Sequence, residues 1–193
     1  MIYDLAGDRK YLTLTERDAF LRVAKRCEPE THTFCLVLAS VGARISEALA
    51  LTPKRIDVNA GYVVIETLKK RRPGIYRAVP ATAELFDLLE QVHQISLARL
   101  YPTTRDRRLW DWSRTTAWSR VKRVMDEAGL DGTRAMPKAL RHAFGVQTIA
   151  GARIPFNMVK KWMGHSRIET TAIYADAVGA EEKKLAQNIW SEG

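Results

Sequence analysis

Cysteine is scarce in this chain: Cys27 and Cys35 are the two cysteines among 193 residues. They form no CxxC pair, and no histidine stands at ligand spacing from them, which argues against a zinc site and a disulfide framework. We interpret both as buried, reduced thiols. Clustered carboxylates or His/Cys ligands are also missing, so no metal and no other cofactor is expected.

Long apolar runs are missing as well. No stretch approaches the roughly 20 apolar residues that a membrane-spanning helix needs, so no membrane partner is expected. The first residues, MIYDLAGDRKYL, carry charges where a signal peptide has its apolar core, which predicts a cytoplasmic protein. Repeats, low-complexity runs and long Gly/Ser linkers are absent too, and we therefore predict one compact domain over residues 1–193.

Positive charge is in excess. Lysine and arginine total 31 against 22 aspartates and glutamates, a formal net charge of +9, and 46% of the residues are hydrophobic. Such a composition is sufficient for a folded core. The positive balance suits a polyanionic partner such as nucleic acid, although a solvated basic surface would explain it equally well.

The hydrophobic spacing predicts mostly helices. Thr15 is expected to cap a first helix that extends to about residue 27, with Asp18 three positions further on. A nearly apolar helix over Thr33–Val41 ends at Gly42, and the segment ARISEALAL resumes helical spacing. Further helices are expected at about 85–92, 118–128, Pro137 to Ala150, Pro155 to Met163, Ile168 to Ala175 and Ala180 to Trp190; the stripe on the second of these comprises Trp118, Val121, Val124, Met125 and Ala128.

One region has a different period. Residues Tyr62 to Thr67 and Ile75 to Val79 are rich in β-formers and flank a turn at Pro73-Gly74. This pattern predicts a small antiparallel sheet of two or three strands. The expected fold class is therefore mainly α with a small antiparallel β-sheet (α+β).

Cations stand at unusual places in this pattern. In GARISE, Arg44 interrupts an apolar segment and Glu47 follows three residues later, which an ordinary ion pair within a helix would also explain. In ETLKKRRPGIYR, five cations surround a turn, as a solvated hairpin tip also would. Lys69 and Lys70 point to opposite faces of a strand, so that one of them can face inward.

Two further motifs lie near the C-terminus. In MPKALRHAFG, Lys138 and Arg141 share a face in the first turns of a helix that begins at Pro137. Cations are unfavourable at this positive end of the helix dipole, so the pair favours an anion site. In MGHSRIETTAIY, Gly164 is expected to end a helix; His165 and Tyr174, taken singly, would be a structural histidine and a core aromatic residue.

In order and spacing, these residues resemble the tyrosine recombinase (phage integrase) family, whose catalytic domain carries Arg, Lys, His/Lys-x-x-Arg, His/Trp and Tyr. The phrases GARISEALAL, PKALRHAF and MGHSRIETTAIY match its sequence boxes, and the resemblance covers about Leu12 to Ala177. Lys138 stands where the family more often has histidine. Most members also carry an N-terminal DNA-clamping domain, which this chain is expected to lack, either as an excised domain or as a short member.

The resemblance implies a site-specific recombinase or integrase that cleaves and rejoins DNA without metal. Tyr174 would attack a phosphodiester and form a 3′-phosphotyrosyl link, while Arg44 and Arg141 hold the phosphate. These cations are expected to lower the pKa of the phenol. Lys69 would be the general acid, with Lys70 in reserve. Lys138 and His165 would donate to the phosphate or assist proton transfer, Glu47 would hold Arg44, and further DNA contacts are expected from Lys70, Arg71, Arg72, Arg77 and His142.

The resemblance also implies partners. Double-stranded DNA would be bound by a homotetramer, whereas the free chain would be a monomer. The tail helix over 179–193 would either be exchanged between subunits or fold back on its own core. In the cell the protein would be associated with the nucleoid. Two alternatives stay open: a type IB topoisomerase that relaxes supercoils, and a non-catalytic DNA-binding regulator descended from a recombinase.

Overall fold

The computed structural model describes residues 3–68, 74–151, 154–165 and 167–174. Helices dominate, and a single three-stranded sheet occurs within the described part, so the expected α+β class is confirmed. In chain order the elements are α1 (Leu14–Ala24), α2 (Pro29–Val41), α3 (Ile45–Leu49), a 3-10 turn (Pro53–Arg55), β1 (Ile56–Asp57), β2 (Tyr62–Glu66), β3 (Tyr76–Pro80), α4 (Ala83–His93), α5 (Ile95–Leu100), α6 (Pro102–Arg105), α7 (Arg114–Glu127), a 3-10 turn (Gly132–Arg134), α8 (Pro137–Val146), a π turn (Gln147–Gly151), α9 (Phe156–Met163) and α10 (Glu169–Ala172).

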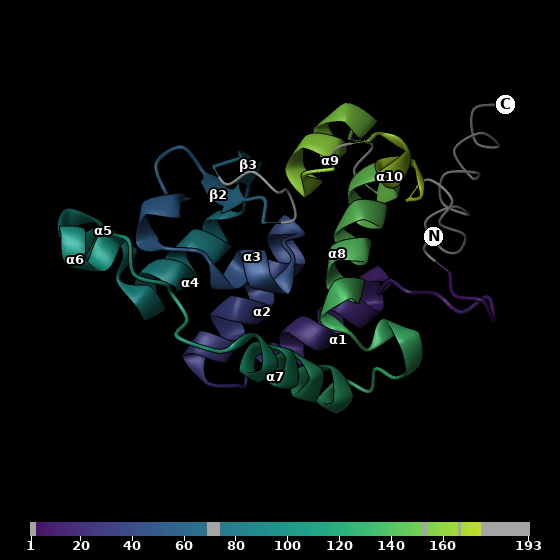
Figure 1. Ribbon diagram of the computed structural model, residues 1–193. Helices are drawn as coiled ribbons and strands as arrows, with labels where there is room; N and C mark the ends of the chain where they lie inside the picture. The colour runs from purple at the N-terminus through teal and green to yellow at the C-terminus, as the bar shows by residue number, and fades with distance from the viewer. Residues whose placement is uncertain (1–2, 69–73, 152–153, 166, 175–193) are drawn as a thin grey trace, which may run out of the picture.

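Helix α2 is the centre of the fold (Figure 1). Its residues from Phe34 to Ala39 are all buried, as expected for a helix that is apolar on every side. Helices α1, α4, α7 and α8 pack against it. Together they enclose the main hydrophobic core, in which Trp110 is the largest fully buried side chain.

The sheet has the order β1-β2-β3, with both pairs antiparallel. On β2, Val63 and Ile65 face the core, and Val79 does so on β3. The same alternation places Arg77 on the buried face, opposite Ile65. The expected turn at Pro73-Gly74 is described only from Gly74 onward, with a φ of 81°.

The N-cap of the first helix lies two residues earlier than expected. Thr13, not Thr15, is the N-cap residue: its hydroxyl accepts from the backbone N–H of Glu16, and the Glu16 carboxylate accepts from the N–H of Thr13. This reciprocal pair satisfies two N–H groups at the helix start, whereas the side chain of Thr15 is exposed. The helix also ends at Ala24 rather than near residue 27, and Cys27, expected to be buried, is half-buried; both thiols are free, as expected.

Helices α8, α9 and α10 lie at the end of the molecule opposite α5 and α6 (Figure 1). They enclose a second, smaller apolar cluster of Tyr11, Val146, Val159, Met163 and Tyr174. The expected helix Ala180 to Trp190 and the tail over 179–193 lie outside the described residues. In the described ranges no helix has both the length and the apolar character to cross a membrane.

Candidate active site

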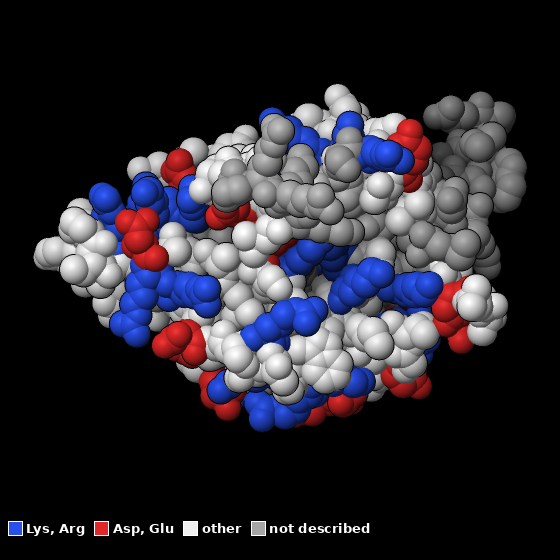
Figure 2. Space-filling model, viewed as in Figure 1, with Lys and Arg blue, Asp and Glu red and all other residues white. Residues whose placement is uncertain are grey.

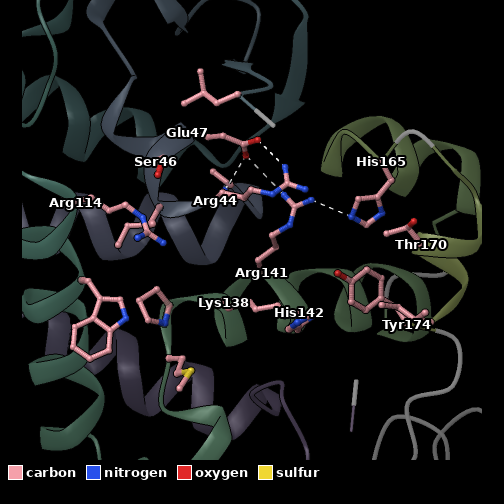
Figure 3. Close-up of a pocket in the computed structure, with 17 residues that line it drawn as sticks. Arg44, Ser46, Glu47, Arg114, Lys138, Arg141, His142, His165, Thr170 and Tyr174 are labelled. Carbon is pink, nitrogen blue, oxygen red and sulfur yellow. Dashed lines mark hydrogen bonds and ion pairs between the residues drawn. The ribbon is translucent and has the colours of Figure 1, made fainter. Parts of the chain in front are cut away.

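A cavity of about 630 Å³ opens between α3, α7, α8 and the chain around α10. It is lined by residues from segments far apart in sequence: Ala43 to Glu47, Leu68, Arg114, Trp118, Met136 to Lys138, Arg141, His142, His165, Thr170, Ile173 and Tyr174. Figure 3 shows the side chains of Arg44, Arg141, His165 and Tyr174 converging on one side of this space. Lys138 borders the same space and is exposed. The fold therefore brings five of the six expected catalytic residues to one cavity.

Arg141 lies at the centre of the cavity wall. It projects from α8, which begins with Pro137 at its first turn, and its guanidinium is buried. One nitrogen donates to the carbonyl of Gly42 at 2.5 Å, and another donates to the carbonyl of Met163 at 2.6 Å. Burial, followed by the neighbouring charge of Arg44, lowers the pKa of Arg141 to about 10, so it stays positive at neutral pH.

Glu47 holds two arginines together. Its carboxylate is 1% exposed and accepts from Nη1 of Arg44 at 2.7 Å and from Nη2 of Arg77 at 2.7 Å. It also accepts from the backbone N–H of Arg44 at 2.9 Å, which fixes the start of α3. Burial alone would raise the pKa of Glu47, but the hydrogen bond and charge of Arg77, together with Arg44, outweigh burial and hold it below its usual value.

Arg77 has a different place from the one expected. It is 6% exposed, and besides Glu47 its guanidinium donates to the carbonyl of Trp162 at 2.7 Å and to the hydroxyl of Thr67 at 3.0 Å. The donors of Arg77 therefore point inward in this structure, and the expected direct DNA contact by Arg77 stays a prediction from the sequence. Arg77 instead ties the sheet to α9 and to the site. Period-two alternation from Val79 is the sequence signal that predicts this inward direction.

The two nitrogens of His165 are both engaged. Gly164 ends α9 with a φ of 65°, as the sequence predicts, and His165 follows it. Nε2 lies 3.0 Å from Nη2 of Arg141, and Nδ1 lies 2.9 Å from the hydroxyl of Thr171. A guanidinium only donates, so Nε2 accepts and the proton of the neutral ring is on Nδ1, which donates to Thr171. Burial, then the charge of Arg141, lowers the pKa of His165 to about 4 and keeps the ring neutral.

Tyr174 is buried within the smaller apolar cluster, with 2% of its surface exposed. Its ring stacks on His165 at 6.1 Å between centroids, and in Figure 3 its hydroxyl end is turned toward Arg141. A Cβ atom built on Gly145 would lie 2.6 Å from the tyrosine ring, so only glycine fits at that position of α8.

The expected lowering of the Tyr174 pKa is wrong for this structure. Burial raises the pKa of Tyr174, and the opposing effects of Arg141 and Arg44 do not compensate for burial. The phenol has left water for an apolar cluster, where its anion is poorly solvated. At neutral pH the phenol is therefore protonated.

His142 follows Arg141 on α8 and is 7% exposed. Its ring lies 5.7 Å from that of Tyr174 between centroids. Neither ring nitrogen has a hydrogen-bond partner among the described residues. Burial, then the charges of Lys138 and Arg141, lowers the pKa of His142 to about 4, so this ring is neutral too.

The segment that carries Lys69, Lys70, Arg71 and Arg72 lies outside the described residues. Leu68, the last described residue before it, lines the cavity and is 47% exposed. The expected general acid and its neighbours therefore stay sequence predictions, although the described chain leads into this segment at the cavity wall.

Four lining or supporting residues were not expected from the sequence. Arg114 and Trp118 of α7 line the cavity, and Trp118 is 42% exposed rather than part of the buried stripe of α7. Ala117 is buried instead, beside Val121. Thr171 supports His165, and Gly145 makes room for Tyr174. A glycine inside a helix is the one local signal among these, because glycine weakens helices unless a close contact requires it.

Basic side chains surround the hollow on the face seen in Figure 2, where Lys and Arg atoms gather at its centre. The lining cations Arg44, Arg114, Lys138 and Arg141 contribute to the cavity wall. In the described ranges, no three His, Cys, Asp or Glu side chains converge in a way that could hold a metal ion. The arrangement suits an anion with several oxygens, since arginine forks match such groups.

Comparisons with known proteins agree with this geometry. The family model described as "Phage integrase family" matches residues 10–180. Tyrosine recombinase XerD of Yersinia pestis is 32% identical over 161 residues, which cover 78% of this chain and 51% of XerD. The chain thus spans about half the length of the curated relatives that it matches.

Solved structures share the fold. XerA recombinase has a TM-score of 0.77 at 19% identity and covers 92% of this chain and 64% of its own. The XerH site-specific recombinase, solved bound to difH substrate as a pre-cleavage complex, has a TM-score of 0.73 at 21% identity. The match covers 97% of this chain and 59% of the XerH chain. The expected membership is confirmed: this chain belongs to the phage integrase family, and it has the fold of tyrosine recombinase catalytic domains.

Proposed function

We propose that this chain is the catalytic domain of a site-specific tyrosine recombinase, which cleaves and rejoins DNA through a 3′-phosphotyrosyl link on Tyr174. The observation that carries the proposal is the convergence of Arg44, Arg141, His165 and Tyr174, with Lys138 at the rim, on one basic cavity. Double-stranded DNA is the proposed partner, supported by the DNA-bound relatives XerH and the Tn1549 integrase.

The scissile phosphate would enter the cavity between the two arginines. Arg44, whose side chain is 31% exposed, offers donors at the cavity wall, while Glu47 fixes its orientation. Arg141 would exchange some of its contacts to the carbonyls of Gly42 and Met163 for phosphate oxygens. Preorganised donors of this kind stabilise the charge that builds on the non-bridging oxygens during attack.

The reaction needs two proton transfers. The oxygen of Tyr174 forms a bond to phosphorus and loses its proton, and the bond from phosphorus to the 5′-oxygen breaks as that oxygen gains one. Lys69 is the proposed donor to the leaving oxygen, with Lys70 as the alternative. Lys138 and His165 would donate to the phosphate. For His165 this requires its Nε2, which now accepts from Arg141, to release that residue and to carry a proton.

Assembly and metal independence belong to the same proposal. We expect a homotetramer on DNA, a monomer in free solution and exchange of the 179–193 tail. No metal ion would be required, because the arginines and Lys138 at the cavity would supply the positive charge at the phosphate. Covalent adduct formation in the presence of EDTA tests the metal requirement, and sedimentation with and without DNA tests the assembly.

Covalent trapping tests the central claim. The wild-type chain and Tyr174→Phe are incubated with supercoiled DNA that contains the gene's own flanking sequence, then denatured and analysed for protein-bound DNA. We expect an adduct on the 3′ side of the break for the wild type and none for Tyr174→Phe. An adduct that persists in Tyr174→Phe would overturn the proposal, because another residue would then be the nucleophile.

The same assay separates the alternatives. Relaxation of unrelated supercoiled DNA with the same tyrosine dependence would favour a topoisomerase. Salt-sensitive DNA binding without an adduct on any DNA would favour a binding regulator and would contradict a catalytic role for this chain.

A further inference from the structure

His142 is a buried imidazole whose polar atoms have no partner in the described part of the chain. The side chain is 7% exposed, and both ring nitrogens are unpartnered. Buried polar groups are almost always hydrogen-bonded, because an unmet donor or acceptor costs free energy. His142 nevertheless lines the cavity that holds the proposed nucleophile, so a reacting group in this cavity lies close to its ring.

The position of His142 on α8 places its ring beside the ring of Tyr174. His142 and Gly145 are three residues apart and share one helix face. The ring of Tyr174 lies against Gly145, where a Cβ atom would be 2.6 Å away, and its centroid is 5.7 Å from that of His142. The missing side chain at Gly145 thus lets the tyrosine ring settle beside the imidazole.

The other titratable side chains of the cavity are poor proton acceptors. Lysine and arginine side chains donate and do not accept, which excludes Arg44, Arg114, Lys138 and Arg141. Glu47 is engaged by two arginines. His165 uses Nε2 to accept from Arg141 and Nδ1 to donate to Thr171. Among the described lining residues, His142 is the one that is neutral and has a nitrogen lone pair without a partner.

We propose that His142 accepts the phenolic proton of Tyr174 as the tyrosine oxygen attacks phosphorus. This inference rests on the proposed recombinase function. The bond from the tyrosine oxygen to phosphorus forms, the proton passes from that oxygen to a ring nitrogen of His142, and the 5′-oxygen leaves with a proton from the general acid. In the rejoining step His142 returns the proton to the departing phenol.

Electrostatics in the cavity suit such a transfer. Burial and then the charges of Lys138 and Arg141 disfavour protonation of His142, which keeps its lone pair available. A bound phosphate would offset these two cations, so the imidazole becomes more basic when substrate is present. The buried phenol also needs an acceptor, because burial raises its pKa.

A leaving-group experiment tests the assignment. Cleavage is measured on ordinary DNA and on DNA with sulfur in place of the bridging 5′-oxygen, since a thiolate leaves without a proton. We expect His142→Gln to lower cleavage about 100-fold or more on both substrates, in the range typical of a lost general base. Lys69→Ala is the matched control: its defect should be relieved by the sulfur substrate. Relief of His142→Gln as well would overturn the proposal, because the histidine would then act on the leaving group.

Chemical rescue distinguishes a proton acceptor from a packing residue. His142→Ala is assayed with added imidazole and with pyrazole, which has the same shape and is a much weaker base. Rescue by imidazole alone supports the proposal, whereas equal rescue by both, or wild-type cleavage by His142→Gln, overturns it. If the wild-type chain forms no Tyr174 adduct at all, the proposed function itself fails, and this outcome is separate from a defect confined to the His142 variants.

Discussion

Tyr174 and Gly145 are linked by direct packing, although 29 positions separate them in the sequence. The tyrosine ring occupies the space that any side chain at position 145 would fill. Burial of Tyr174 in turn makes its phenol harder to ionise. One packing contact thus affects both the position of the proposed nucleophile and its acidity.

The variant Gly145→Ala should separate stability from activity. In a helix, alanine is favoured over glycine by about 0.5–1 kcal/mol, so an uncrowded site would gain stability. Here the new methyl group overlaps the ring of Tyr174, and we expect no gain in the free energy of unfolding and at least a tenfold loss of DNA cleavage. Urea unfolding and covalent trapping check this. Thr115→Ala, at an exposed position of α7, is the control and should leave cleavage unchanged. Normal cleavage by Gly145→Ala would contradict the packing argument.

At the scale of elements, helix ends decide where the site residues lie. Gly42 ends α2 with a φ of 59°, and its carbonyl accepts from Arg141. A Cβ atom at this position would lie 2.5 Å from the ring of Phe144. The left-handed turn at Gly42 therefore lets α2 and α8 approach each other and places a backbone acceptor for Arg141.

Two glycine variants test this close approach. Gly42→Ala should lower the free energy of unfolding by about 2–4 kcal/mol, the sum of left-handed strain and overpacking against Phe144. Gly129→Ala is the matched control: it has a φ of 71° and nothing within 4 Å of a new Cβ atom. It should cost only the strain, about 1 kcal/mol. Equal losses in the free energy of unfolding for the two variants, measured by urea unfolding, would show that overpacking against Phe144 does not contribute to the cost at position 42.

The first helix offers a second matched pair. Thr13→Ala removes the hydroxyl that accepts from the N–H of Glu16 and should lower the free energy of unfolding by about 1 kcal/mol. Thr15 is exposed within the first turn, so Thr15→Ala should change stability by less than about 0.5 kcal/mol. Thermal or urea unfolding of both variants measures these losses. A larger loss for Thr15→Ala than for Thr13→Ala would place the cap at Thr15, where the sequence pattern alone puts it.

For the whole molecule, burial of histidines makes stability sensitive to acid. His93, His142 and His165 each have a pKa of about 4, with burial as the first cause, against about 6.5 in an unfolded chain. Between these values the unfolded chain binds protons that the folded chain does not. The contribution of these neutral histidines to the free energy of unfolding is therefore fully present above about pH 6.5 and is lost as the pH falls toward 4.

Urea unfolding at pH 7 and pH 5 measures this effect. We expect a lower free energy of unfolding at pH 5, and a smaller difference for His93→Gln, which removes one of the three groups. Glu47, whose pKa is lowered, contributes stability that is lost only below about pH 4.3, so it does not confuse the comparison. Equal stability of the wild type at both pH values would contradict the burial of these rings as neutral groups.

Much of the architecture could be predicted from the sequence, because helix and strand periods depend on neighbours along the chain. The α+β class, the β2–β3 pair, the helix end at Gly164 and the family boxes are all local patterns. Boundaries were less predictable: the cap at Thr13 depends on a reciprocal bond with Glu16, and a similar threonine two residues later competes with it.

The sequence by itself therefore determined the fold class, the family and the order of Arg44, Lys138, Arg141, His165 and Tyr174 along the chain. Tertiary structure alone decided which groups are in water. It turned Arg77 inward to Glu47, raised the pKa of Tyr174 and left His142 without a partner beside it. The reason is physical: spacing sets the face on which a residue lies, but desolvation and hydrogen bonding depend on what distant segments pack against that face.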